Sequence, residues 1–187
     1  MQYLYAQLKG NQMTTEQTLA SWITQEAQVR KSLGAAGPIP RDVASTMSGM
    51  ELFEAIISGE LPSPPICETL DFVLVHVSRG TTVYQGKPLP RHFNPLGTVH
   101  GGWFCTLLDS AMGCAVHTML PAGKIYTTLE IKVNMIRALT EAVPLVRAEG
   151  KVIHAGRQSA TAEGRIVGSD GKLYAHATTT CLILEAF

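Results

Sequence analysis

Apolar residues concentrate in one long run, Trp103 to Leu120, whose only charged side chain is Asp109. At 18 residues this run is near the lower limit for a membrane span, and it also contains His117. Strand-like segments follow it. A helix that is apolar nearly all round is typical of one enclosed by protein. We therefore expect a buried central helix from about His100 to Leu120, not a membrane span.

Around this run, polar and apolar residues alternate with the period of β-strands. The alternation is clearest over residues 125–136, where Leu129 and Ile131 are interleaved with Glu130 and Lys132. Gly-containing turns separate most of these segments. The strands are expected at residues 69–78, 81–85, 125–136, 143–154, 158–167 and 173–184.

Helical spacing dominates the first third of the chain. Residues 14–33 predict a helix with Thr14 or Thr15 as its N-cap, and residues 49–58 predict a second, shorter one. The Gly- and Pro-rich stretch 34–40 breaks the first helix. We predict an N-terminal helical extension over residues 1–48 and a main domain over 49–187. Met13 is an alternative start, which would make residues 1–12 a leader.

The element order is two strands, a long buried helix, then four strands at short spacing. Short meander connections predict an antiparallel sheet that curls around one helix. The fold class is therefore α+β, with the outline of a hotdog fold.

Composition narrows the function. Formal net charge is zero, so no basic surplus indicates nucleic acid or an anionic membrane as a partner. The four cysteines form no CxxC pair and are interpreted as buried free thiols, which suits a reducing cytoplasm. The start, Met1 to Tyr5, lacks the pattern of a secretory signal. The histidines show no metal spacing, so we predict no metal and no separate cofactor.

The stretch Asn94 to Gly102, with sequence NPLGTVHGG, leads directly into the apolar helix. A helix start presents bare N–H groups and a partial positive charge. Gly101 and Gly102 allow a substrate to approach the backbone closely. Asp109, eight residues further along, supplies a carboxylate for general-base or nucleophilic work. The combination indicates hydrolysis at a carbonyl group.

This loop, the Leu-Asp pair at 108–109 and the later strand TLEIKVN resemble the PaaI-type acyl-CoA thioesterases of the hotdog superfamily. The resemblance covers about residues 69–184. It implies acyl-CoA as substrate, with coenzyme A as part of that substrate, and active sites at a homodimer interface. Dimers could pair into tetramers.

The resemblance also implies individual roles. Asp109 matches the general base or nucleophile, and Asn94 matches the loop amide at the carbonyl or the attacking water. Gly101 matches the glycine whose N–H polarises the carbonyl, and Thr128 matches a hydroxyl that holds the water. The loop and helix start come from one subunit, and the aspartate and hydroxyl from the other.

Three residues keep two interpretations. His100 is either a catalytic base or a cap of the loop, and capping is favoured because Asp109 already fills the base role. Thr128 has the numbering parity of Glu130 and not of the apolar face, so Thr127 is an alternative hydroxyl and plain strand propensity a further explanation. Arg157, after the Ala155–Gly156 turn, could bind phosphates of coenzyme A or simply be solvated.

Arg137 and Arg165 are further candidates for the phosphates. One departure from the family pattern is Ala138, where a proline often follows the arginine at the end of the strand.

The leading interpretation is a cytoplasmic acyl-CoA thioesterase. A hotdog dehydratase or hydratase is an alternative, because His92–Phe93 resembles a motif of that group. A non-catalytic acyl-CoA-binding protein is the third. The sequence does not separate water attack from an acyl-aspartyl intermediate, nor does it specify the acyl group.

Overall fold

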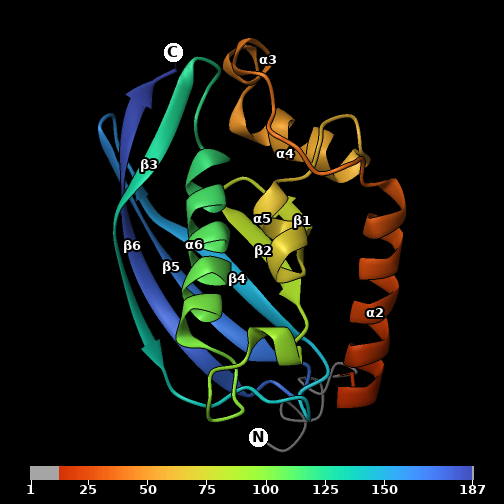
Figure 1. Ribbon diagram of the computed structural model, residues 1–187. Coiled ribbons are helices and arrows are strands. Elements are labelled where there is room, and N and C mark those ends of the chain that lie inside the picture. The colour runs from red at the N-terminus through yellow and green to blue at the C-terminus, as the bar shows by residue number, and fades with distance from the viewer. Residues whose placement is uncertain (1–12, 187) are drawn as a thin grey trace, which may run out of the picture.

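The computed structural model describes residues 13–186. A six-stranded antiparallel sheet curls around one long helix, α6 (Gly101–His117), while the remaining helices lie at one side (Figure 1). The strand order is β1-β2-β4-β5-β6-β3. This arrangement confirms the predicted hotdog fold. The predictions about residues 1–12, a leader before Met13 and the lack of a secretory signal, lie outside the described residues.

The strands follow the predicted segments with small changes at their ends. Their bounds are β1 Phe72–Ser78, β2 Thr81–Gly86, β3 Lys124–Met135, β4 Val146–Ala155, β5 Ser159–Gly168 and β6 Leu173–Glu185. The first half contributes α2 Thr15–Ser32, α3 Arg41–Thr46, α4 Gly49–Ser58, α5 Pro65–Leu70 and the 3₁₀ turn η1 Pro90–His92.

Helix α6 is enclosed by the sheet, as its composition predicts. Leu107, Leu108, Ala111 and Met112 are fully buried. Gly150 of β4 permits this close packing, because a Cβ there would lie 2.2 Å from the carbonyl oxygen of Ala111. Among the described residues, no helix is both long and apolar enough to cross a membrane.

The N-terminal helices begin where the sequence predicts. Thr14 caps α2 in a capping box with Gln17, and Ser48 caps α4 in the same way with Glu51. Helix α4 ends at Gly59, whose φ of 85° is left-handed. Helix α4 also supplies buried residues to the main core. The domain boundary at residue 48 stays a prediction.

Two parts of the sequence prediction were wrong. Residues 69 and 70 belong to helix α5 and not to β1, because Pro65 occupies the first turn of a short helix that ends at Asp71, with φ 51°. The proline cluster at residues 62–65 therefore leads into a helix, whereas Gly59 already ends the previous one. Strand β4 begins only at Val146, because Pro144 lacks an N–H and Val143 donates its own to Thr140 in a turn. Helix α3 was not predicted.

Candidate functional site

The loop before α6 is a compact, hydrogen-bonded unit. His100 donates its backbone N–H to the His92 carbonyl (2.8 Å), and Asn94 donates its own to the Thr98 carbonyl (2.8 Å). The Asn94 side chain bonds within the same loop: Oδ1 accepts the Leu96 N–H at 2.9 Å, and Nδ2 donates to Thr98 Oγ1 at 2.9 Å. Asn94 therefore shapes the loop and directs one remaining amide hydrogen elsewhere.

His100 is the N-cap of α6. Its Nδ1 accepts the Gly102 N–H at 2.9 Å, which assigns the ring hydrogen of the neutral form to Nε2. The capping interpretation of His100 is confirmed, while a catalytic role stays a prediction.

The neighbouring Gly101 N–H is different. Among the hydrogen bonds of residues 13–186, none uses it. The helix start thus offers one unpaired donor. A Cβ at Gly101 would lie 2.9 Å from Cε of Met135, so the end of β3 packs over this glycine.

Asp109 and Thr128 lie together. Thr128 Oγ1 donates to Asp109 Oδ1 at 2.9 Å, and both residues are half-buried. The numbering parity of Thr128 was misleading because β3 contains a bulge: Thr128 pairs with Cys181 but Glu130 pairs with Thr180. The extra residue, Leu129, reverses the faces, so Thr128 points toward the helix.

Gly101 and Asp109 lie on one helix, eight residues apart, which at 1.5 Å per residue is about 12 Å. That is too far for both to act on one carbonyl. The hydroxyl that binds Asp109 comes from β3, an edge strand of the sheet. The carboxylate therefore lies near the sheet edge, where a second chain could bring its own helix start.

The buried thiols near the helix are poor nucleophiles. Cys114 Sγ lies 3.2 Å from the Tyr84 hydroxyl, and burial raises the pKa of Cys114 to about 11. Burial likewise raises the pKa of Cys67 to about 12. All four cysteines are free; Cys67 and Cys181 are buried as predicted, whereas Cys105 and Cys114 are only half-buried.

The remaining candidate residues are two arginines and His92. Arg157 is exposed at the turn between β4 and β5. Arg165 is paired with Glu149 at 2.7 Å. His92 belongs to the His92–Phe93 pair that resembles a dehydratase motif. It is 6% exposed and stacks on Trp103, which is the third residue of α6. No sequence signal indicated that stacking. Within residues 13–186 no group of three or more His, Cys, Asp or Glu side chains could hold a metal ion.

Several known proteins resemble this chain in sequence and in fold. The thioesterase superfamily profile matches residues 96–175. A 1,4-dihydroxy-2-naphthoyl-CoA hydrolase of Listeria monocytogenes is 27% identical over 106 residues, which are 57% of this chain and 85% of the relative. A phenylacetic acid degradation-related protein from Ralstonia eutropha superposes with a TM-score of 0.64 at 29% identity, covering 70% of this chain and 98% of that one.

A conserved protein from Pseudomonas aeruginosa superposes with a TM-score of 0.60 at 30% identity, covering 64% of this chain and 93% of that one. The matched segment of the profile contains Gly101, Asp109 and Thr128, and the fold is shared over most of each solved structure. The chain belongs to the thioesterase superfamily.

Proposed function

We propose that the protein hydrolyses acyl-CoA thioesters to a free acid and coenzyme A, as a PaaI-type enzyme. The observation that carries the proposal is the Asp109–Thr128 hydrogen bond, which orients the only charged side chain of the buried helix. Burying a carboxylate costs free energy unless it is paired or hydrogen-bonded, so its place in an apolar helix supports a functional role. The unpaired Gly101 N–H supplies the second requirement, a donor for an oxyanion.

The chemistry follows from these groups. The thioester oxygen accepts the Gly101 N–H, and Asp109 takes a proton from a water held by Thr128. The water oxygen bonds to the carbonyl carbon, whose oxygen becomes an oxyanion. When the oxyanion reforms the carbonyl, the C–S bond breaks and the thiolate of coenzyme A takes up a proton. Alternatively, Asp109 attacks the carbon itself and expels the thiolate of coenzyme A, which takes up a proton. Water then hydrolyses the mixed acyl-aspartyl anhydride to the free acid and Asp109.

The remaining amide hydrogen of Asn94 is suited to the carbonyl or to the attacking water. Arg157, exposed at its turn, is the proposed contact for a phosphate of coenzyme A.

A homodimer completes the site in this proposal. Strand β3 is a free edge with two large exposed side chains, Leu129 at 61% and Met135 at 48%. An exposed apolar edge strand is suited to pair with another chain. A two-fold axis beside β3 would bring Gly101 and Asn94 of each subunit to Asp109 and Thr128 of the other.

Release of free thiol from aromatic and aliphatic acyl-CoA esters tests the function. We expect turnover of at least one ester, with free acid as the product. Binding of the esters without thiol release would indicate a non-catalytic binding protein instead. A product that keeps its thioester but has gained or lost water at its acyl carbons would indicate a dehydratase or hydratase. In a single turnover in ¹⁸O-labelled water, label found in Asp109 identifies an acyl-aspartyl intermediate that water opens at the aspartyl carbon, whereas direct attack of water places the label in the product acid alone.

A further inference from the structure

Helix α6 carries a half-exposed stripe that begins at the helix start and contains the proposed site. Gly101, Cys105 and Asp109 follow one another at intervals of four residues, so they lie on one side of the helix. All three are half-buried. Gly113 is the next residue of this series, yet it is buried. The stripe is therefore open from the helix start to Asp109 and closed one turn beyond it.

The side chain of Tyr126 closes the stripe. Strand β3 runs alongside α6 (Figure 1), and Tyr126 and Thr128, two residues apart on this strand, point to the same face of the sheet. Thr128 hydrogen-bonds Asp109. A Cβ added to Gly113 would lie 2.5 Å from the hydroxyl oxygen of Tyr126. Tyr126 therefore fills, one turn beyond Asp109, the space that Gly113 leaves by having no side chain.

Aromatic rings continue this closure behind Tyr126. The ring centre of His117 lies 5.5 Å from that of Tyr126, and Phe53 of α4 packs edge-to-face on His117 at 5.6 Å. The Tyr126 hydroxyl shares a hydrogen bond with Cys114, and burial raises the pKa of Tyr126 well above its ordinary value. Burial also lowers the pKa of His117 below 6.5. At neutral pH this end of the stripe is uncharged and largely apolar, whereas the other end reaches the exposed Gly102 at the helix start.

We propose that Tyr126 is a specificity-determining residue that restricts the site to short-chain acyl-CoA. This inference rests on the proposed thioesterase function, which places the thioester carbonyl at Asp109. The acyl group is the apolar half of the substrate, so it lies toward the aromatic end of the stripe, and the polar coenzyme A leaves by the open end. An acyl chain that follows the helix past Asp109 meets the Tyr126 ring at Gly113, four residues or about 6 Å further along.

Substitutions of Tyr126 separate the effect of its ring from that of its hydroxyl. Tyr126→Ala removes the ring and opens the space over Gly113. Tyr126→Leu is a milder change that tests the same point if the Tyr126→Ala protein does not fold. Tyr126→Phe keeps the ring and loses only the hydroxyl. Tyr84→Phe is the matched control, because the Tyr84 hydroxyl also contacts Cys114, at 3.2 Å, but Tyr84 belongs to β2 and not to β3. The melting temperature of each variant shows whether it is folded.

Thiol release is measured with butyryl-CoA, hexanoyl-CoA and decanoyl-CoA. The parent, Tyr126→Phe and Tyr84→Phe should all prefer butyryl-CoA to decanoyl-CoA. In Tyr126→Ala, the ratio of kcat/KM for decanoyl-CoA to kcat/KM for butyryl-CoA should rise at least about tenfold, and in Tyr126→Leu it should rise by less. Calorimetry measures binding of S-butyl-CoA and S-decyl-CoA, which are thioethers and cannot be hydrolysed. S-decyl-CoA should bind Tyr126→Ala about tenfold more tightly than it binds the parent.

An unchanged ratio in folded Tyr126→Ala and Tyr126→Leu would overturn the proposal, as would a parent that hydrolyses decanoyl-CoA as efficiently as butyryl-CoA. An equal rise in Tyr126→Phe and Tyr126→Ala would also contradict it, because the hydroxyl and not the ring would then set the limit.

If the parent releases no thiol from any ester, the proposed function is wrong, and the thioethers then decide the size limit. Tighter binding of S-decyl-CoA by Tyr126→Ala than by the parent would support the limit. Binding that is equal in the two proteins, or absent from both, would refute it.

Discussion

The two edge strands of the sheet, β1 and β3, differ in what packs against them. At the β1 edge, helix α2 covers the strand: Val29 packs on Val73 and Val75, and Gln25 Nε2 donates to the Val75 carbonyl at 2.8 Å. At the β3 edge, Leu129 and Met135 are exposed. An open edge strand normally promotes association. The chain thus packs its own extension on one face of the edge strand β1, called here the closed edge, and leaves apolar side chains exposed on β3, the open edge beside Asp109.

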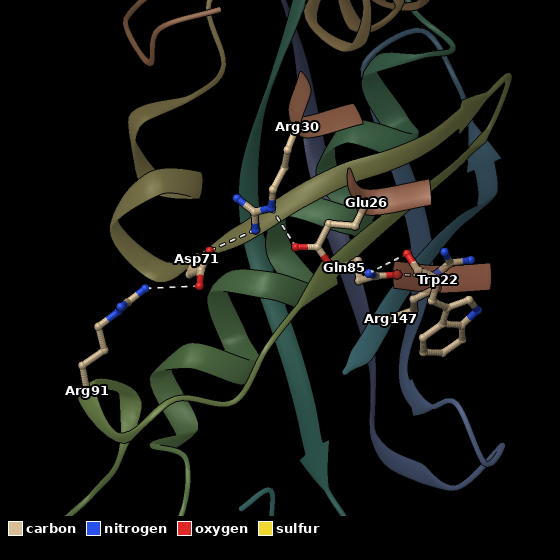
Figure 2. Close-up of polar contacts among 7 residues, drawn as sticks. All are labelled: Trp22, Glu26, Arg30, Asp71, Gln85, Arg91 and Arg147. Carbon is tan, nitrogen blue, oxygen red and sulfur yellow. Dashed lines mark hydrogen bonds and ion pairs between the residues drawn. The ribbon is translucent and has the colours of Figure 1, made fainter. Parts of the chain in front are cut away.

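Polar contacts hold the extension on the closed side (Figure 2). Gln85 of β2 is fully buried and donates to the Trp22 carbonyl and to Glu26. Arg147 of β4 donates to Gln85 at 2.9 Å and to Gln25 at 2.7 Å, and its guanidinium lies 4.4 Å from the Trp22 ring centre. Such a connected network fixes one docking position for α2.

The largest expected effect is at the open edge, on Asp109→Asn. Thiol release should fall by about 10²–10⁴, the range for a lost general base. Folding stability should hold or rise, because a half-buried amide loses less hydration free energy than a half-buried carboxylate. Turnover and melting temperature are measured on the same preparation. Parent-like turnover would place the chemistry elsewhere, with His100 the next residue to test.

Leu129→Lys tests whether the open edge is a subunit interface. We expect sedimentation to show a smaller species and turnover to fall with the loss of the dimer, because a charge at a buried interface is strongly unfavourable. Ile153→Lys is the matched control, since Ile153 is 60% exposed and lies on the central strand β4. A monomeric Leu129→Lys variant with parent activity would contradict a shared site.

On the closed edge, Gln85→Leu should affect stability and not chemistry. The substitution removes one hydrogen bond each from Arg147 and Glu26, which keep Gln25 and Arg30 as partners, and it costs about 1–3 kcal/mol. The free energy of unfolding is measured by urea titration, and kcat for a short acyl-CoA ester by thiol release. A large fall in kcat without a loss of stability would mean that the two edges are coupled.

The smallest effect concerns pH and involves His117, at the end of α6 between the rings of Phe53 and Tyr126. Burial lowers the pKa of His117 below 6.5. Between the lowered value and 6.5, the unfolded chain binds more protons than the folded one, so stability decreases as pH falls through this window. His117→Phe should lose less stability than the parent between pH 7 and pH 5, as measured by urea titration. If the parent and His117→Phe lose the same stability over this pH range, the titration of His117 does not contribute to the pH dependence.

Much of the fold could be predicted, because the period of two and the single apolar helix are local signals. Thr128 illustrates what could not be. The side of the sheet to which Thr128 points depends on a bulge at Leu129. That bulge is set by pairing with β6, which is far away in the sequence. The packing of α2 on β1 was equally out of reach, since the buried Gln85 looks like an ordinary surface residue of a strand. Asp109 and Gly101 could be proposed because both stand out locally, one by charge and one by position before a helix.

Subunit complementation tests the central claim, that each site uses Gly101 of one chain and Asp109 of another. Gly101→Val and Asp109→Asn are each expected to be nearly inactive. For Gly101→Val, turnover should fall by about 10²–10³, because the substrate loses access to the helix N–H. Met135, which packs over Gly101, is half exposed and has room to move aside. The two variants are unfolded together, refolded as an equal mixture and assayed for thiol release. In a mixed dimer one site carries both substitutions and the other neither, so the mixture should regain about a quarter of parent activity. A mixture as inactive as its components, although sedimentation shows dimers, would contradict the shared site.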